Sequence, residues 1–344
     1  IGNTGIAQYS PGTFDIDCSY FDTLNYDGQK GLVLWSKWLG AYRLRSSFDE
    51  LFQSLNAVFS IGCGIEIKNG KETLVIREKK HFYDEQTIIE ELGEISNLIV
   101  ETDKDKIINE IAIGYESQDY SNGISSQYEV NQGSVYRIEL ESNPAPKKLE
   151  LISKYRADFT GLLDILENNI DVEDIFFCYI KYNSYMDEII ADDNGVIEIK
   201  SIFKTLYNAA LTPRHILLNH AKYLNSIFYG ITSDTTTIRF ISSDLNNLHA
   251  SVSRFPNDPY VKESDPVAIT SDILFKPFIF TFDAVIGSDF LSNYVEYPNG
   301  VYQFTHDGNE YRGFLIEAKI KVMNKSSATI KLLCSSDTMI TNLK

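Results

Sequence analysis

Residues 47–76 read SFDELFQSLNAVFSIGCGIEIKNGKETLVI, and this stretch decides the first structural unit. Ser47 and Glu50 have the spacing of a capping box, in which a hydroxyl and a carboxylate satisfy two otherwise unpaired backbone amides at a helix start. Apolar residues then recur at helical intervals and predict one buried helix face: Phe48, Leu51, Phe52, Leu55 and Phe59. We expect Gly62 and Gly64 to end this helix.

A β-hairpin is predicted directly after the helix. Residues 65–67 and 74–76 alternate or cluster apolar side chains, and Asn69-Gly70 lies between them. Asn and Gly both tolerate the positive φ that a two-residue hairpin turn requires. The sequence therefore predicts a helix-then-hairpin unit.

The rest of the chain alternates short apolar segments with turn residues, which is typical of a mostly β protein. We expect strands at 107–115, 135–140, 175–182, 196–199, 236–241, 279–282, 301–305, 311–322 and 328–334. We expect helices within 32–44, 159–166 and 287–297, and one that starts at Thr212-Pro213. The predicted fold class is mostly β (α+β), with several β-barrel- or sandwich-like domains and a few helices.

The 344 residues are long enough for two or three domains. Polar and proline-rich punctuation at 142–148 marks one boundary. We expect four regions: an N-terminal arm or connector at 1–45, a helix-hairpin β domain at 46–145, an α+β middle domain at 146–230 and a C-terminal β domain at 231–344. Because the chain begins at Ile1 without an initiator Met, we also expect it to be a piece of a longer protein.

The charge balance argues against one class of partner. The chain has 48 acidic and 31 basic residues, a formal net charge of −17. An acidic surface repels phosphate backbones, so we expect no specific nucleic-acid binding. Apolar runs are also too short for a membrane helix, which needs about 20 apolar residues, so no membrane span is expected.

Residues that usually carry chemistry do not form a recognisable motif. His215 and His220 are five apart, which does not place two imidazoles on one helix face as a zinc helix requires. His306 is next to Asp307 at a predicted turn, and we interpret it as a surface residue. The four cysteines are far apart in sequence, and we expect them to be buried free thiols: Cys18, Cys63, Cys178 and Cys334. We expect no catalytic, cofactor-binding or metal-ligating residue, and no cofactor.

Two alternatives remain open. Adjacent carboxylates could serve a glycan hydrolase, and the candidate pairs are Asp187-Glu188, Asp192-Asp193 and Glu90-Glu91. The turn at 192–195 could also ligate calcium. The 21 Tyr and 20 Phe suit cross-strand packing and subunit interfaces, while exposed clusters of them would suit a carbohydrate- or receptor-binding module.

Several stretches of the chain, taken together, resemble a family of long proteins from phages and prophages of Bacteroidota. They are SFDELFQSLN (47–56), IGCGIE (61–66), the strand at 69–76, LGEISNL (92–98), NEIAIGYE (109–116), KLELISKYRAD (148–158), Thr212-Pro213-Arg214, Phe275-Lys276-Pro277 and Gly313-Phe314. The order of helix, hairpin and strands also looks like that of phage baseplate hub proteins, in which domains from three subunits form a ring between tail tube and spike. This second resemblance is one of topology.

These resemblances imply a non-enzymatic structural protein of a phage tail tip or baseplate hub. The implied partners are other tail proteins and further copies of this chain, with a trimer as the hub-like state. The implied location is the tail of the virion, after assembly in the host cytoplasm. Such proteins act through surfaces, so the resemblance transfers no functional residue to this sequence.

Overall fold

A computed structural model describes the fold of most of the chain. The described residues are 13–16, 30–35, 47–68, 70–106, 108–116, 134–137, 147–157, 175–181, 188–191, 197–200, 213–229, 238–240, 267–269, 272–320 and 327–338. Strands dominate them, and the prediction of a mostly β, α+β protein is confirmed.

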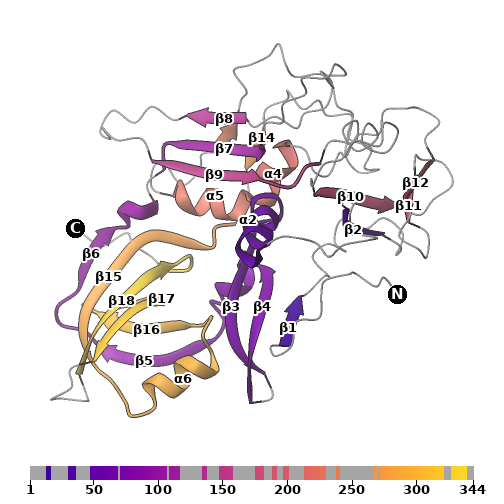
Figure 1. The fold of residues 1–344 in the computed structure, drawn as a ribbon. Coiled ribbons are helices and arrows are strands. Elements are labelled where there is room, and N and C mark those ends of the chain that lie inside the picture. Colours follow the sequence, from indigo (N-terminus) through magenta and orange to yellow (C-terminus); the bar gives the residue numbers. More distant parts are fainter. Residues whose placement is uncertain are drawn as a thin grey trace.

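The largest sheet has six strands and rolls into an incomplete barrel (Figure 1). In spatial order its strands are β5 (Ile88–Glu94), β16 (Val301–His306), β17 (Asn309–Ile320), β18 (Ser327–Ser335), β15 (Phe275–Val285) and β6 (Ile99–Thr102). Its two edge strands, β5 and β6, follow one another in sequence. Because five residue steps span at most about 18 Å, the two edges must approach each other where β5 ends and β6 begins.

Aromatic side chains fill the barrel. Phe304 contacts three other rings, with centroid distances of 5.5 Å to Phe280, 4.5 Å to Phe282 and 5.3 Å to Tyr311. All four side chains are almost completely buried. Helix α6 (Phe290–Glu296) adds Phe290, whose ring centroid lies 5.1 Å from that of Tyr302 in β16. The barrel therefore has its own dense core.

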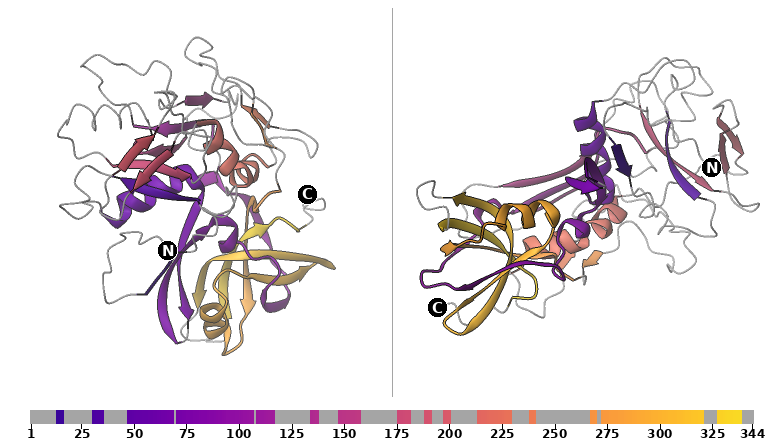
Figure 2. Two further views of the ribbon diagram at one scale, coloured as in Figure 1. Left: turned by 90° about the vertical axis from the view of Figure 1, so that its right-hand side faces the viewer. Right: turned by 90° about the horizontal axis from the view of Figure 1, so that it is seen from below.

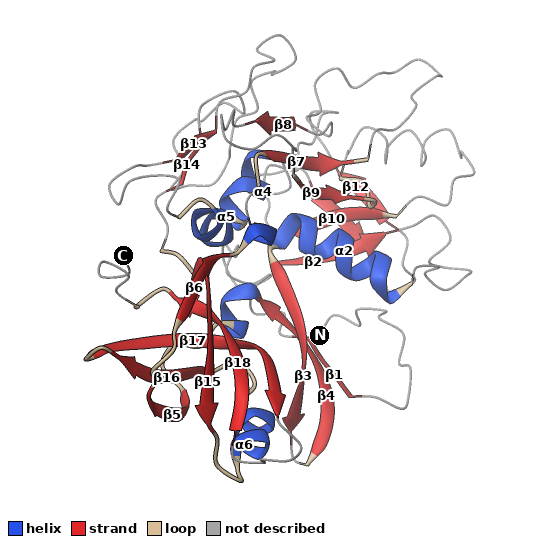
Figure 3. Ribbon diagram, turned by 90° about the vertical axis from the view of Figure 1, so that its left-hand side faces the viewer, coloured by secondary structure: helices blue, strands red, loops and turns tan. Residues whose placement is uncertain are grey.

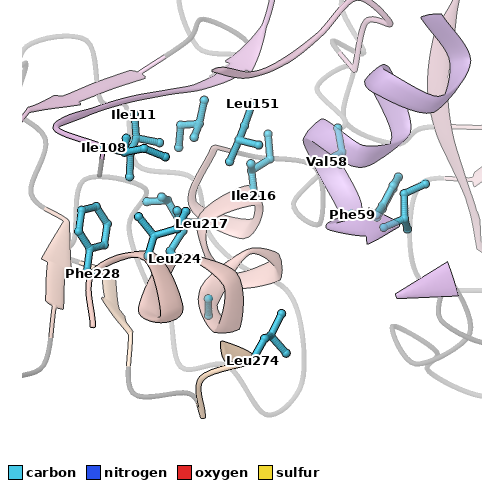
Figure 4. Close-up of a cluster of buried hydrophobic side chains, with 14 of the residues drawn as sticks. Val58, Phe59, Ile108, Ile111, Leu151, Ile216, Leu217, Leu224, Phe228 and Leu274 are labelled. Atoms are coloured by element: carbon cyan, nitrogen blue, oxygen red, sulfur yellow. The ribbon is translucent and has the colours of Figure 1, made fainter. Parts of the chain in front are cut away.

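A second layer combines a small sheet with helices. The sheet order is β8 (Ser134–Arg137), β7 (Glu110–Tyr115) and β9 (Lys148–Ser153), with β7 and β9 parallel. The helices are α2 (Phe48–Phe59), α4 (Pro213–Asn219) and α5 (Ala221–Ile227). Figure 4 shows their side chains meeting in one apolar cluster, which includes Val58, Ile111, Leu151, Ile216 and Leu224.

A hairpin connects to this layer and runs alongside the barrel (Figure 3). It consists of β3 (Ile61–Lys68) and β4 (Lys71–Glu78), and β1 (Thr13–Ile16) pairs in parallel with β4. Two short 3₁₀ turns, η1 (Lys79–Phe82) and η2 (Lys104–Lys106), follow β4 and β6.

Three two-stranded pairs complete the described strands: β2 (Lys30–Trp35) with β10 (Phe176–Lys181), β11 (Glu188–Ala191) with β12 (Ile197–Lys200), and β13 (Ile238–Phe240) with β14 (Val267–Ile269). The first two pairs lie at the end of the molecule away from the barrel (Figure 2).

The predicted helix-then-hairpin unit is confirmed, but the helix does not end where the sequence predicts. The Ser47 hydroxyl accepts the backbone N–H of Glu50 at 3.1 Å and caps α2. The helix ends at Ser60, which takes a left-handed conformation (φ 56°), and Gly62 and Gly64 lie inside β3. The prediction that the two glycines end the helix is therefore wrong. Close packing of the Phe82 ring against β3 explains their presence.

The predicted helix within 32–44 is also wrong where it can be compared, because Lys30–Trp35 is strand β2. Its partner β10 lies about 140 residues further along the chain and carries the aromatic and β-branched residues of a strand. The tertiary contacts of this long-range strand pairing outweigh the weak local preference for a helix. The predicted helix at 159–166 lies outside the described residues.

The sheets join segments from different expected regions. Strand β9 follows the expected boundary at 145 and pairs with β7, which precedes it. Strands β5 and β6, from the expected 46–145 domain, form both edges of the barrel built by 275–335. Strands β1 and β2 draw parts of the expected arm, 1–45, into sheets. Turn residues mark chain reversals, but they do not show which strands pair.

Candidate functional site

The inner face of the hairpin packs closely on η1. Gly62 and Gly64 alternate with outward residues along β3, and both face the ring of Phe82. A Cβ atom at Gly62 would lie 2.6 Å from Phe82 Cδ2, and one at Gly64 would lie 2.9 Å from Phe82 Cε1. These separations are shorter than any ordinary carbon–carbon contact. The two glycines are therefore needed so that the aromatic ring can lie against the strand backbone.

Glu66 continues the same face and ties the hairpin to the barrel. Its Oε1 lies 2.5 Å from His81 Nε2 in η1 and accepts a hydrogen bond of 3.0 Å from the side-chain amide of Asn299, just before β16. Burial alone would raise the pKa of Glu66, but the hydrogen bonds and charge of His81, with Asn299, hold it below its usual value. The inner face therefore anchors a well-positioned hairpin.

The outer face of β3 has the opposite character. Cys63, Ile65 and Ile67 point away from η1, and Ile65 and Ile67 are 64% and 51% exposed. Helix α6 lies against β3, as Figure 3 shows, and exposes Leu291 and Val295, one helical turn apart. These five residues lie on two adjoining elements, and we call them together the hairpin–α6 surface. The prediction that Cys63 is a buried thiol is wrong, whereas Cys334 is a buried free thiol as predicted.

Glu90 and Glu91, one of the candidate carboxylate pairs, do not converge. Both lie in β5, where Glu90 is opposite Tyr302 and Glu91 is opposite Gln303. Successive residues of a strand point to opposite faces, so the two carboxylates diverge. The candidate pair Asp192-Asp193, the calcium ligands proposed at 192–195, and the side chains of Asp187 and Glu188 lie outside the described part of the chain.

His220 serves the packing of helices. Its Nε2 lies 2.9 Å from the carbonyl oxygen of Asn56 and 3.0 Å from that of Ala57, and both oxygens belong to the last turn of α2. Nε2 must therefore carry the proton and donate to them. Burial, with the charge of Lys79, lowers the pKa of His220 well below its usual value. The side chain of His215 lies outside the described residues.

His306 is more enclosed than a surface residue, and that prediction is corrected. The turn itself forms as expected, with positive φ at Asp307 and Gly308. The His306 side chain, however, is only 19% exposed, and its Nδ1 donates to the carbonyl oxygen of Ile95 at 2.5 Å. This bond holds the connection between β5 and β6 against β16. No local sequence signal marks this contact, because its partner lies more than 200 residues away.

Two further observations bear on the site. Within the described ranges, no three His, Cys, Asp or Glu side chains are grouped so that they could hold a metal ion. No described helix is long and apolar enough to cross a membrane. The thiols of Cys18 and Cys178 lie outside the side chains that the structure describes.

The chain matches no known protein-family model, and no curated protein matches its sequence. Function must therefore be inferred from its surfaces. Of these, the hairpin–α6 surface combines two exposed isoleucines with a strand that is held firmly on its other face.

Proposed function

We propose that this chain is a non-enzymatic structural subunit of a phage or prophage tail, at the tail tip or a baseplate hub, and that it assembles through the hairpin–α6 surface. The observation that carries the proposal is the pair of isoleucines, Ile65 and Ile67, exposed on a hairpin whose other face is tightly anchored. The partners are further copies of the chain or neighbouring tail proteins.

Docking of the hairpin–α6 surface on a partner would withdraw apolar side chains from water. Burying a Val, Leu or Ile side chain contributes about 1.5–3 kcal/mol when the side chain is fully withdrawn from water. The hairpin–α6 surface offers four such side chains, which are Ile65, Ile67, Leu291 and Val295. Because β3 is held by Phe82 and by the Glu66–His81–Asn299 contacts, little conformational entropy would be lost on docking.

The positions of the aromatic residues favour assembly over sugar binding. The described aromatic side chains gather mainly inside the barrel and around Phe275, while Phe48 and Tyr297, which are prominently exposed, lie on separate elements. A carbohydrate platform needs several exposed rings side by side. The aromatic content therefore supports folding and subunit packing.

The acidic charge also suits a tail ring. A ring through which a genome passes gains from a surface that does not hold phosphates, because attraction would slow transit. The net charge of −17 supplies such a surface if the acidic residues line the opening.

Solution mass and electron microscopy test this function. Light scattering over a range of protein concentrations should give a closed multiple of the 39.1 kDa chain, with three copies as the hub-like expectation. Negative-stain images should show rings. A chain that stays monomeric at all concentrations, alone and with purified tail proteins, would overturn the proposal.

A further inference from the structure

Two lysines lie over neighbouring aromatic rings where the hairpin, the barrel and the helical layer meet. Lys79, in η1, places its Nζ 4.2 Å from the ring centroid of Tyr223 in α5. Lys106, in η2, places its Nζ 5.5 Å from the ring centroid of Phe275 in β15. The two rings are themselves in contact, with centroids 6.0 Å apart, and Tyr83 lies 5.3 Å from Phe275. Both ammonium groups therefore face one aromatic wall.

Among the described residues, the side-chain neighbours of the two ammonium groups are aromatic rings rather than oxygen acceptors. A ring face attracts a cation electrostatically but accepts no conventional hydrogen bond, while each ammonium has three N–H donors. Among the described residues, no carboxylate lies within ion-pair distance of Lys79 or Lys106. Burial, and then the charge of Asp103, raises the pKa of Tyr223, and Asp103 Oδ1 accepts the backbone N–H of Asp105 at 2.9 Å.

The two positive charges also oppose each other. Burial and then the charge of Lys106 lower the pKa of Lys79 to about 8. Burial and the charge of Lys79 keep the neighbouring imidazole of His220 neutral. A negatively charged group between the two ammonium ions would offset this repulsion and accept hydrogen bonds from both.

We propose that Lys79 and Lys106 form a binding site for a small oxyanion, either a phosphate or a carboxylate. The bound anion would bridge η1 of the hairpin and η2, which follows β6 of the barrel, beside the aromatic wall of Tyr223 and Phe275. Binding would therefore fix the hairpin and the helical layer relative to the barrel. This site is separate from the hairpin–α6 surface and does not depend on the proposed assembly.

Titration with inorganic phosphate at constant ionic strength tests the site. Lys79→Met and Lys106→Met keep the aliphatic contact with the rings and remove the charge. Lys80→Met and Lys104→Met are matched controls, because Lys80 and Lys104 are exposed neighbours on the same two 3₁₀ turns. Phosphate should raise the melting temperature of the wild type and both controls by several degrees and leave Lys79→Met and Lys106→Met unchanged. Equal shifts in all five proteins, or no shift in the wild type, would overturn the site.

A second measurement needs no variant and remains decisive if the methionine variants do not fold. Acetic anhydride labels accessible amines, and mass spectrometry locates the label. Phosphate should protect Lys79 and Lys106 from labelling several-fold and leave Lys80 and Lys104 unaffected. Parallel labelling with acetate in place of phosphate shows which oxyanion is preferred. Labelling of Lys79 and Lys106 that neither anion reduces would contradict the proposal.

Discussion

The barrel and the hairpin are both antiparallel β structures for most of their length, yet they use their faces differently. In the barrel, the inward residues of neighbouring strands form a closed aromatic core around Phe304. In the hairpin, one face of β3 is reduced to Gly62 and Gly64 so that Phe82 can approach, and the other exposes Ile65 and Ile67. The inward residues of the barrel are buried within one chain, while its outer face also exposes Val285, Ile99 and Ile316. In the hairpin, one face of β3 is packed against Phe82 and the other face is exposed to solvent.

This difference separates residues that stabilise the fold from residues available for assembly. Changes in the barrel core should alter the free energy of unfolding of the single chain. Changes on the outer face of β3 should alter association and leave the single chain nearly unaffected. The following predictions test that separation, from the largest expected change in stability to the smallest.

Phe304→Ala should lower the free energy of unfolding most. It removes a buried ring that contacts Phe280, Phe282 and Tyr311, and substitutions of this kind typically cost about 3–5 kcal/mol. Urea unfolding followed by circular dichroism measures the change. Tyr297→Ala is the control, because it truncates an exposed aromatic residue just after α6 and should cost little. Similar losses in both variants would show that the barrel core is not the main source of stability.

Gly62→Ala should destabilise the chain by about 1–3 kcal/mol, because the new methyl group would overlap the Phe82 ring. Cys63→Ala is the matched control on the outer face of the same strand and should be nearly neutral. In a Phe82→Ala background, the cost of Gly62→Ala should largely disappear, which a double-mutant cycle detects. A cost that persists without the ring would contradict the proposed contact.

The Glu66 contacts should give a smaller, pH-dependent effect. Since the pKa of Glu66 is lower in the folded chain than its usual value, its ionised form stabilises the fold above about pH 5. That contribution, on the order of 1 kcal/mol for a partly exposed pair, is lost as pH falls through the folded pKa. Glu66→Gln should therefore be less stable than the wild type at pH 7, and the difference should shrink by pH 3. A difference that is constant between these pH values would contradict the assignment.

Elements with a strong local signal were predictable. The Ser47–Glu50 cap, the apolar face of α2 and the turn of the β3–β4 hairpin are each encoded by residues close in sequence. The same holds for the positive-φ turn between β16 and β17. In all these cases the physical cause and its effect lie within a few residues of each other.

Features that depend on distant partners were not predictable. Gly62 and Gly64 look like helix terminators until Phe82 is placed against them. The strand at Lys30–Trp35 needs β10, and the enclosure of His306 needs Ile95. The hairpin–α6 surface likewise depends on which side of β3 the anchoring contacts occupy. Alternation predicts that two faces exist but does not show which of them the rest of the chain covers.

Sedimentation velocity of a matched pair of variants tests the central claim most directly. Ile65→Ser/Ile67→Ser polarises the outer face of β3, while Ile99→Ser polarises β6, an equally exposed strand on the far side of the barrel (Figure 1). We expect the wild type and Ile99→Ser to sediment as the same oligomer, and the double variant to sediment as a folded monomer with unchanged urea stability. Retention of the wild-type oligomer by the double variant would contradict the assignment of this face to assembly.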